Sequence, residues 1–156
     1  MAVDPVTPQL ERLCRATVEI GPPLQVGPTP LGERRIIPIT GGRVEGERLR
    51  GEVLPGGADW QIVRADGAAV LEARYCVRAE DGALIFVVNT GIRVAAPDVL
   101  ARLARGEPVA PREYYFRTTP RFETSAPRYA WLNDVVAVGS AVRTPGAVIL
   151  DFYVVR

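Results

Sequence analysis

Residues 60–90 read WQIVRADGAAVLEARYCVRAEDGALIFVVNT, and the pattern in this stretch decides the fold. Three runs with the composition of strands, at 60–64, 69–78 and 83–90, are separated only by two turns of the Asp-Gly kind. Such turns favour tight β-hairpins because aspartate and glycine tolerate the backbone conformations that a short loop requires. Three successive strands joined in this way predict an antiparallel meander.

The rest of the chain extends this pattern. Alternation predicts further strands at 13–20, 34–40, 113–119, 129–138 and 147–155. The proline-rich residues 21–30 predict a loop, the polar residues 42–53 a solvated hairpin edge, and residues 96–105 one short helix that begins at a proline. About eight strands with one helix predict an all-β fold, either a single antiparallel β-barrel or a strongly bent sandwich. We expect one domain over 1–156, with its core at 9–155 and residues 1–8 as an N-terminal tail.

Composition excludes much chemistry. The chain has no histidine, and its 19 basic residues are all arginine. It therefore lacks the imidazole of a catalytic triad or metal site and the lysine of a Schiff base or P-loop, so we expect neither a metal nor a cofactor. The net charge of +1 indicates no nucleic-acid partner. Two cysteines and no signal peptide or membrane-length apolar run predict a cytoplasmic protein with no membrane partner.

The residues that could form a pocket gather around the segment LPGGADWQ at 54–61. Its two glycines indicate an unusual backbone path, and Asp59 and Trp60 follow them directly. Period-two alternation places Arg117 beside aromatic residues, puts Trp131 and Asn133 on one strand face, and ends an apolar strand at Asn89. The sequence thus predicts a small-molecule pocket with these members: Asp59, Trp60, Tyr75, Asn89, Arg117, Trp131 and Asn133.

Each of these residues has a structural alternative. The two tryptophans could be core residues, and Asp59 could simply cap the Gly-Gly turn. Arg117 could form a structural ion pair with Glu123 or Asp59, and Asn133 could satisfy backbone groups in a bulge.

Several motifs together resemble a known family. They are GERR at 32–35, LPGGADWQ at 54–61, NTG at 89–91, RTTPRFET at 117–124 and YAWLN at 129–133. This set resembles the uncharacterised DUF3237 family, also called UPF0311. The resemblance implies a single-domain β-barrel that self-associates as a homodimer or other small homo-oligomer, and it implies no established activity. It draws attention to the motif positions Arg34, Asp59, Trp60, Asn89, Arg117, Phe122, Glu123, Trp131 and Asn133.

Three functions are compatible with these features. The first is a cofactor-independent isomerase, cyclase or lyase acting on a small aromatic or polyketide-like carbonyl or carboxylate compound. Asp59 or Glu123 would move a proton, Arg117 would hold an oxyanion, and Arg34, Trp60, Tyr75, Asn89, Phe122, Trp131 and Asn133 would bind the ligand. The second is a non-catalytic binder or carrier of the same ligands. The third is an interaction scaffold with a filled barrel, which predicts no cavity.

Overall fold

Ten strands and three short helices make up the computed structural model, which describes all 156 residues. The strands are β1 (Leu10–Ile20), β2 (Leu24–Thr29), β3 (Gly32–Glu45), β4 (Gly51–Val53), β5 (Ala58–Val63), β6 (Ala69–Ala79), β7 (Leu84–Val94), β8 (Tyr115–Glu123), β9 (Val136–Arg143) and β10 (Ala147–Val155). The helices are α1 (Pro97–Ala104), η1 (Pro111–Glu113) and η2 (Pro127–Asp134), the last two of the 3₁₀ type.

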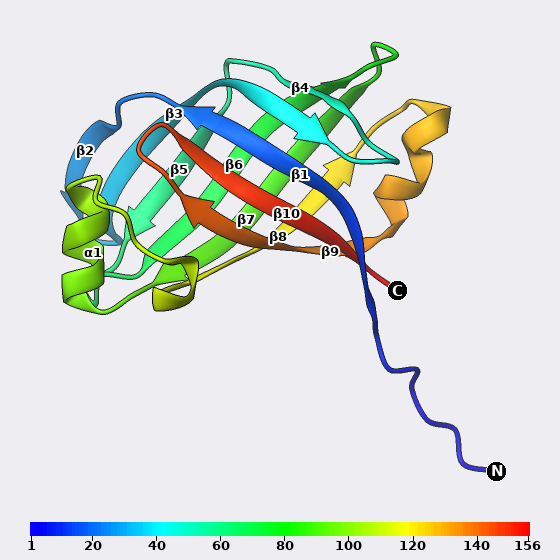
Figure 1. The fold of residues 1–156 in the computed structure, drawn as a ribbon, viewed down its shortest axis with the longest axis horizontal. Coiled ribbons are helices and arrows are strands. Elements are labelled where there is room, and N and C mark those ends of the chain that lie inside the picture. Colours follow the sequence, from blue (N-terminus) through cyan, green and yellow to red (C-terminus); the bar gives the residue numbers. More distant parts are fainter.

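The strands close into an antiparallel barrel (Figure 1). Their order is β1-β10-β9-β8-β7-β6-β4-β3-β2, and an additional pairing between β1 and β3 closes the ring. β5 pairs with β3 and β6, so β4 and β5 share one place in the wall. The predicted all-β barrel is therefore confirmed, and closure through β1 and β3 excludes the strongly bent sandwich.

The meander predicted from residues 60–90 is present as β5, β6 and β7. Each of its turns is held by an aspartate that accepts a backbone N–H two residues later. Asp66 Oδ1 accepts from Ala68 N at 3.1 Å, and Asp81 Oδ1 accepts from Ala83 N at 3.1 Å. These local bonds explain why this part of the fold could be predicted from the sequence.

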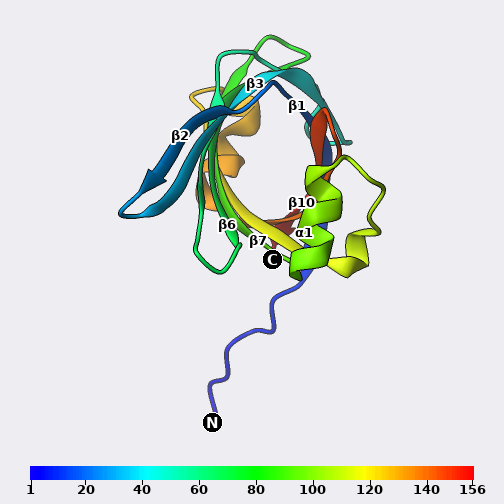
Figure 2. The same cartoon turned by 90° about the vertical axis from the view of Figure 1, so that its left-hand side faces the viewer.

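Two predictions for the N-terminal half are wrong. Residues 24–29 form a strand rather than a loop. This strand, β2, pairs only with the start of β3, and an edge strand can contain a proline because one of its sides makes no strand hydrogen bonds. This hairpin projects from the barrel wall (Figure 2). The predicted strand at 34–40 continues as β3 to Glu45, so residues 42–45 are not an exposed edge. Gly42 permits this continuation: its φ is +132°, and a side chain there would collide with the backbone oxygen of Thr17 on β1.

The predicted strand at 129–138 is also wrong. Residues 127–134 form the helix η2, and the strand that follows begins only at Val136. The two buried side chains of η2, Tyr129 and Leu132, are three residues apart, which is the repeat of a 3₁₀-helix. Tyr129 and Trp131 are two residues apart, which fits the period of a strand, but they belong to a helix.

The helix predicted near residue 100 is confirmed as α1. Pro97 occupies its first turn, and Val99 and Leu103 are its buried residues. No helix of the chain has the length and apolar character needed to cross a membrane. In Figure 2, α1 stands at the rim of the barrel end that faces the viewer. We call this the α1 end, and the opposite end, where η2 lies, the η2 end.

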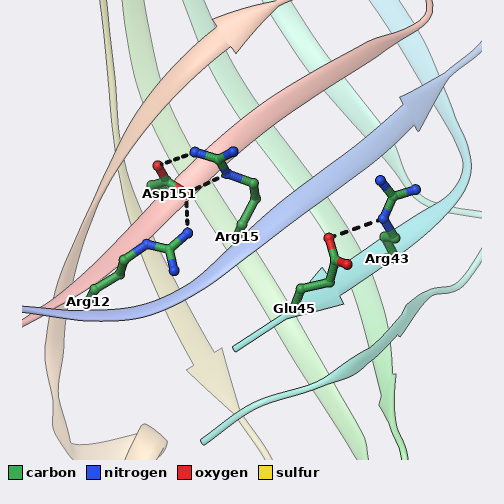
Figure 3. A network of polar contacts seen from close by, with 5 residues as sticks. All are labelled: Arg12, Arg15, Arg43, Glu45 and Asp151. Carbon is green, nitrogen blue, oxygen red and sulfur yellow. Dashed lines mark hydrogen bonds and ion pairs between the residues drawn. The ribbon is translucent and has the colours of Figure 1, made fainter. Parts of the chain in front are cut away.

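Strand β1 has an apolar inner face and a charged outer face. Cys14, Ala16 and Val18 are buried as alternation predicts. Leu13, which by alternation belongs to the opposite face, is buried as well, because a register shift between Arg12 and Cys14 breaks the alternation. On the outer face, Asp151 of β10 accepts hydrogen bonds from Arg12 and Arg15 at 2.8–2.9 Å (Figure 3). These guanidinium groups, Arg15 first, lower the pKa of Asp151 to about 2.

Candidate functional site

The barrel interior contains a cavity at the α1 end. The space in it that the centre of a water-sized sphere can reach is about 50 Å³, and the cavity is partly open to solvent. Aliphatic and aromatic side chains form most of its wall, and a smaller polar group interrupts them. The polar members are Asp59, Gln61, Asn89, Arg93, Thr118 and Arg143. Apolar walls with a few convergent polar groups are typical of small-molecule sites.

Strand register brings these polar residues together. Asp59 of β5 lies opposite Ala73 of β6, which in turn lies opposite Asn89 of β7. Because side chains alternate between the two faces of a strand, Gln61 points inward two residues after Asp59. The same alternation carries the inner face of β7 from Asn89 to Arg93. A patch of polar groups thus extends across neighbouring strands and along β7 toward the α1 end.

Asp59 is the only carboxylate in the cavity wall, and it is 7% exposed. Its Oδ2 accepts a hydrogen bond from Gln61 Nε2 at 3.0 Å, and its Oδ1 accepts one from the backbone N–H of Glu72 at 2.9 Å. Burial disfavours the charged form and raises the pKa of Asp59, while these two hydrogen bonds oppose the rise. A carboxyl group with a raised pKa holds a proton more readily, which suits it to accept and return one.

Three arginines surround this part of the cavity. Arg35 of β3 donates through Nη2 to Gln61 Oε1, which links it indirectly to Asp59. Arg93 is 6% exposed, and burial, followed by the charges of Arg143 and Arg35, lowers its pKa to about 10. Burial and the charge of Arg35 also lower the pKa of Arg143. Even at these pKa values, Arg93 remains positively charged at neutral pH.

Several polar atoms in this region have no hydrogen-bond partner. They are Arg35 Nε, Asn89 Oδ1, Arg93 Nε and Thr118 Oγ1, and together they make up every unpartnered buried side-chain polar atom of the chain. Natural proteins pair nearly all such atoms, because an unpaired buried donor or acceptor costs about 1–3 kcal/mol. Their concentration around one cavity is the pattern expected of a site whose ligand supplies the missing partners.

Three of the residues predicted from the sequence lie in this cavity. Asp59, Tyr75 and Asn89 all line it, and each is at most 7% exposed. Their positions agree with the predicted pocket, whereas their roles in binding or catalysis stay predictions. Asp59 does not merely cap the Gly-Gly turn, since its hydrogen bonds go to Gln61 and Glu72.

Four other predicted residues lie outside the barrel interior. Arg117 and Glu123 are exposed on the outer face of β8, between the buried inward residues Phe116, Thr118 and Phe122. Arg117 forms no ion pair with Glu123 or Asp59, and its Nη1 instead donates to the carbonyl oxygen of Phe116 at 2.9 Å. The prediction that Arg117 lines the pocket is wrong because the other face of the strand, which carries Phe116 and Thr118, points into the barrel.

Trp60, on the first strand of the meander, also lies on the face opposite to the one predicted. Trp60 is 43% exposed on the outer face of β5, between the inward Asp59 and Gln61. Arg34 lies beside it and donates through Nη1 to the carbonyl oxygen of Trp60 at 2.7 Å. Neither residue lines the cavity, and the expected stacking of Trp60 on a ligand inside the barrel is corrected accordingly.

The remaining predicted residues lie at the η2 end. Phe122 packs edge-on against Phe152, with 6.0 Å between ring centroids. The guanidinium carbon of Arg48 lies over the Trp131 ring, 3.7 Å from the ring centroid. Trp131 does not line the cavity at the α1 end. Asn133 bridges backbone groups by accepting from Thr124 N at 2.9 Å and donating to Thr124 O at 3.0 Å. This contact corresponds to the structural alternative for Asn133, in which its side chain satisfies backbone groups.

Sequence reasoning missed most of the polar group. Gln61 could have been found, because it follows Asp59 at the strand period. Arg93 was missed because the strand was ended at Thr90, although β7 continues to Val94. Arg143 ends β9, whose start was assigned wrongly. Nowhere does the fold bring three or more carboxylate or thiol groups together as a metal site; the absence of metals and cofactors stays a prediction.

Comparisons with known proteins agree with this architecture. A family model described as a protein of unknown function (DUF3237) matches residues 8–155. A UPF0311 protein of Rhodopseudomonas palustris is 47% identical over 150 residues, covering 95% of this chain and 98% of that protein. The crystal structure of a β-barrel-like protein from Acinetobacter baumannii has a TM-score of 0.88 at 46% identity and covers 99% of this chain and 100% of its own.

A more distant relative has a named activity. The hydroalkoxylation enzyme phnH of Penicillium herquei is 29% identical over 136 residues, covering 87% of this chain and 76% of that protein. The family model and the close relatives both extend over nearly the whole barrel, so the resemblance seen in the motifs is confirmed. The chain belongs to the DUF3237 family.

Proposed function

We propose that this chain is a cofactor-independent enzyme that moves a proton on a small organic molecule bound in the cavity at the α1 end. One observation carries the proposal. A single buried carboxylate, Asp59, faces an otherwise largely apolar cavity and is surrounded by polar atoms that lack partners. Burying such groups is unfavourable, and a filled barrel would have no use for them. Active sites are where proteins retain this arrangement.

The chemistry that suits this site is addition, elimination or ring closure at an unsaturated carbonyl or hydroxyaromatic compound. In adding a hydroxyl across a carbon–carbon double bond, the O–H and π bonds break while a C–O and a C–H bond form. Asp59 would accept the proton from oxygen and return it to carbon, so that no cofactor is consumed. Arg93 and Arg143 would hold negative charge carried by the substrate. The hydroalkoxylation activity named for the distant relative from Penicillium herquei supports this class.

The alternative is a carrier that binds the same compound without changing it. A carrier needs the apolar wall and some polar contacts, but it does not need a carboxyl group with a raised pKa. The two functions therefore differ in what Asp59 does. Loss of Asp59 removes turnover from an enzyme, whereas a carrier has no turnover to lose.

The test is turnover in deuterated water with a panel of hydroxylated, unsaturated aromatic and polyketide-like compounds, followed by NMR and mass spectrometry. We expect at least one compound to isomerise, cyclise or exchange a carbon-bound proton. Asp59→Asn should slow that reaction about 10²–10⁴-fold, the range expected for a general acid–base group. Asp66→Asn is the matched control, because Asp66 is the exposed turn residue of the neighbouring hairpin. Binding without any turnover would instead identify a carrier.

A further inference from the structure

The cavity at the α1 end has an unbalanced charge. Arg93 and Arg143 line it, and Arg35 reaches it through its hydrogen bond to Gln61. Against these three guanidinium groups stands the single carboxylate of Asp59. No acidic side chain forms an ion pair with any of the three arginines, since every ion pair of the chain involves other residues.

This arrangement differs from every other part of the molecule. Outside the barrel, eleven arginines pair with carboxylates, as Arg12 and Arg15 do with Asp151, and those without such a pair include the exposed Arg117. Inside, the Nε atoms of Arg35 and Arg93 are buried with no partner at all. A buried charge without a counter-charge is strongly unfavourable. Burial, and next to it the repulsion from the other arginines, lowers the pKa values of Arg93 and Arg143.

A guanidinium group presents its donors in a planar fork that matches a carboxylate. Arg93 and Arg143 come from β7 and β9, on either side of β8, while Asp59 comes from β5. An anion drawn to the two arginines and repelled by Asp59 would have its charged end toward β7–β9. Its apolar body would then lie against the aliphatic and aromatic wall that includes Leu71, Tyr75 and Phe116.

We propose that the ligand of this cavity is an organic carboxylic acid with an apolar, aromatic or polyketide-like body, bound as its carboxylate between Arg93 and Arg143. This inference rests on the proposed function insofar as the cavity is the substrate site, but it concerns binding and needs no turnover. In this arrangement the unpaired arginines bind the negative charge of the ligand, and Asp59 is free to act on another part of the same molecule.

The experiment compares acids with their neutral amides. Benzoate, cinnamate and 2-naphthoate, and the three corresponding amides, are titrated into the purified protein by calorimetry and thermal shift. We expect at least one acid to bind and its amide to bind at least tenfold more weakly. Arg93→Gln and Arg143→Gln should each weaken the acid about thirtyfold or more, the loss typical of truncating one partner of a buried charge pair. The matched control is Arg117→Gln, whose arginine lies on the outer face of β8.

A second measurement does not depend on the choice of probe. Removing a partly buried charge that has no counter-charge should stabilise the ligand-free protein, so Arg143→Gln should raise Tm by about 2–4 °C. Arg117→Gln should shift Tm by less than about 2 °C. Equal binding of acid and amide, failure of all three acids to bind, or a lower Tm for Arg143→Gln would each overturn the inference.

Asp59→Asn separates this inference from the proposed function. It removes the only negative charge of the cavity, so the acid should bind as tightly as before or more tightly, while turnover is lost. If the carboxylate still binds and depends on the arginines but no compound is turned over, the anion site stands and the enzyme proposal fails. If a neutral compound is turned over through Asp59 and no acid binds, the enzyme proposal stands and the anion site fails.

Discussion

The two ends of the barrel interior are built from the same strands and differ in almost every other respect. At the η2 end, side chains such as Cys14, Ile85, Phe122 and Phe152 are buried in one hydrophobic cluster. At the α1 end, the same β7 presents Asn89 and Arg93 to a cavity. The same cluster also includes cavity-wall residues such as Leu71 and Phe116, so apolar packing spans both ends, whereas the unpartnered polar atoms gather around the α1 end. Functional sites commonly carry such a stability penalty.

The largest expected effect tests where stability resides. Phe152→Ala at the η2 end should lower the free energy of unfolding by about 3–5 kcal/mol, because it opens a void in a filled region. Phe116→Ala should cost less than about 3 kcal/mol, because Phe116 lines the cavity and its open side has few partner atoms to lose. Both rings are at most 2% exposed, so the pair is matched in burial. Urea denaturation measures both, and equal losses would contradict the division.

A smaller effect tests the unpaired atoms themselves. Thr118 is 4% exposed and its Oγ1 has no partner, so Thr118→Val should raise the free energy of unfolding by up to about 1 kcal/mol. Thr119→Val is the control on the outer face of the same strand, where Thr119 Oγ1 lies 3.0 Å from Thr90 Oγ1. We expect no gain from that change. A loss for Thr118→Val in urea denaturation would mean that its hydroxyl contributes to the fold.

The smallest expected effect is on the pH dependence of stability, because the pKa values of Asp59 and Asp151 are shifted in opposite directions. The raised pKa of Asp59 means that its contribution to stability is fully present below its ordinary value of 3.8 and is lost as pH rises through its folded-state value. The lowered pKa of Asp151 means that its contribution is present above 3.8 and is lost as pH falls toward about 2.

The corresponding measurement is urea denaturation of Asp59→Asn and Asp151→Asn between pH 3 and pH 7. Relative to the unsubstituted protein, the Asp59 variant should gain stability as pH rises and the Asp151 variant should lose it. Parallel pH dependence of the two variants would show that the inner and outer carboxylates share one electrostatic environment.

The fold was largely predictable where its signals are local. The turns at Asp66 and Asp81 are held by hydrogen bonds within two residues, so the meander could be read from composition and spacing. Helix η2 could not, because alternation at Tyr129 and Trp131 satisfies the strand pattern equally well. Only packing of Leu132 into the η2 end distinguishes the two. The path of β3 past Gly42 likewise depends on a contact with β1, which is distant in the sequence.

The candidate site was predictable in part. Residue types near strand ends indicate Asp59 and Asn89, and alternation within its strand indicates Tyr75; all three line the cavity. Arg117 was chosen for its aromatic neighbours, but Arg93 and Arg143 occupy the interior. The two alternations of a strand differ by one residue, and a strand's start at Tyr115 rather than Glu113 gives no clue to which face is buried.

By itself, the sequence determined the chemistry available to this protein and the class of its fold. A chain without histidine or lysine must use carboxyl and guanidinium groups, and its repeated turns commit it to short antiparallel strands. The tertiary structure alone decided which arginines are buried together and which end of the barrel stays hollow. The physical reason is that closure through β1 and β3 sets the inward face of every strand at once, whereas local pattern constrains each strand separately.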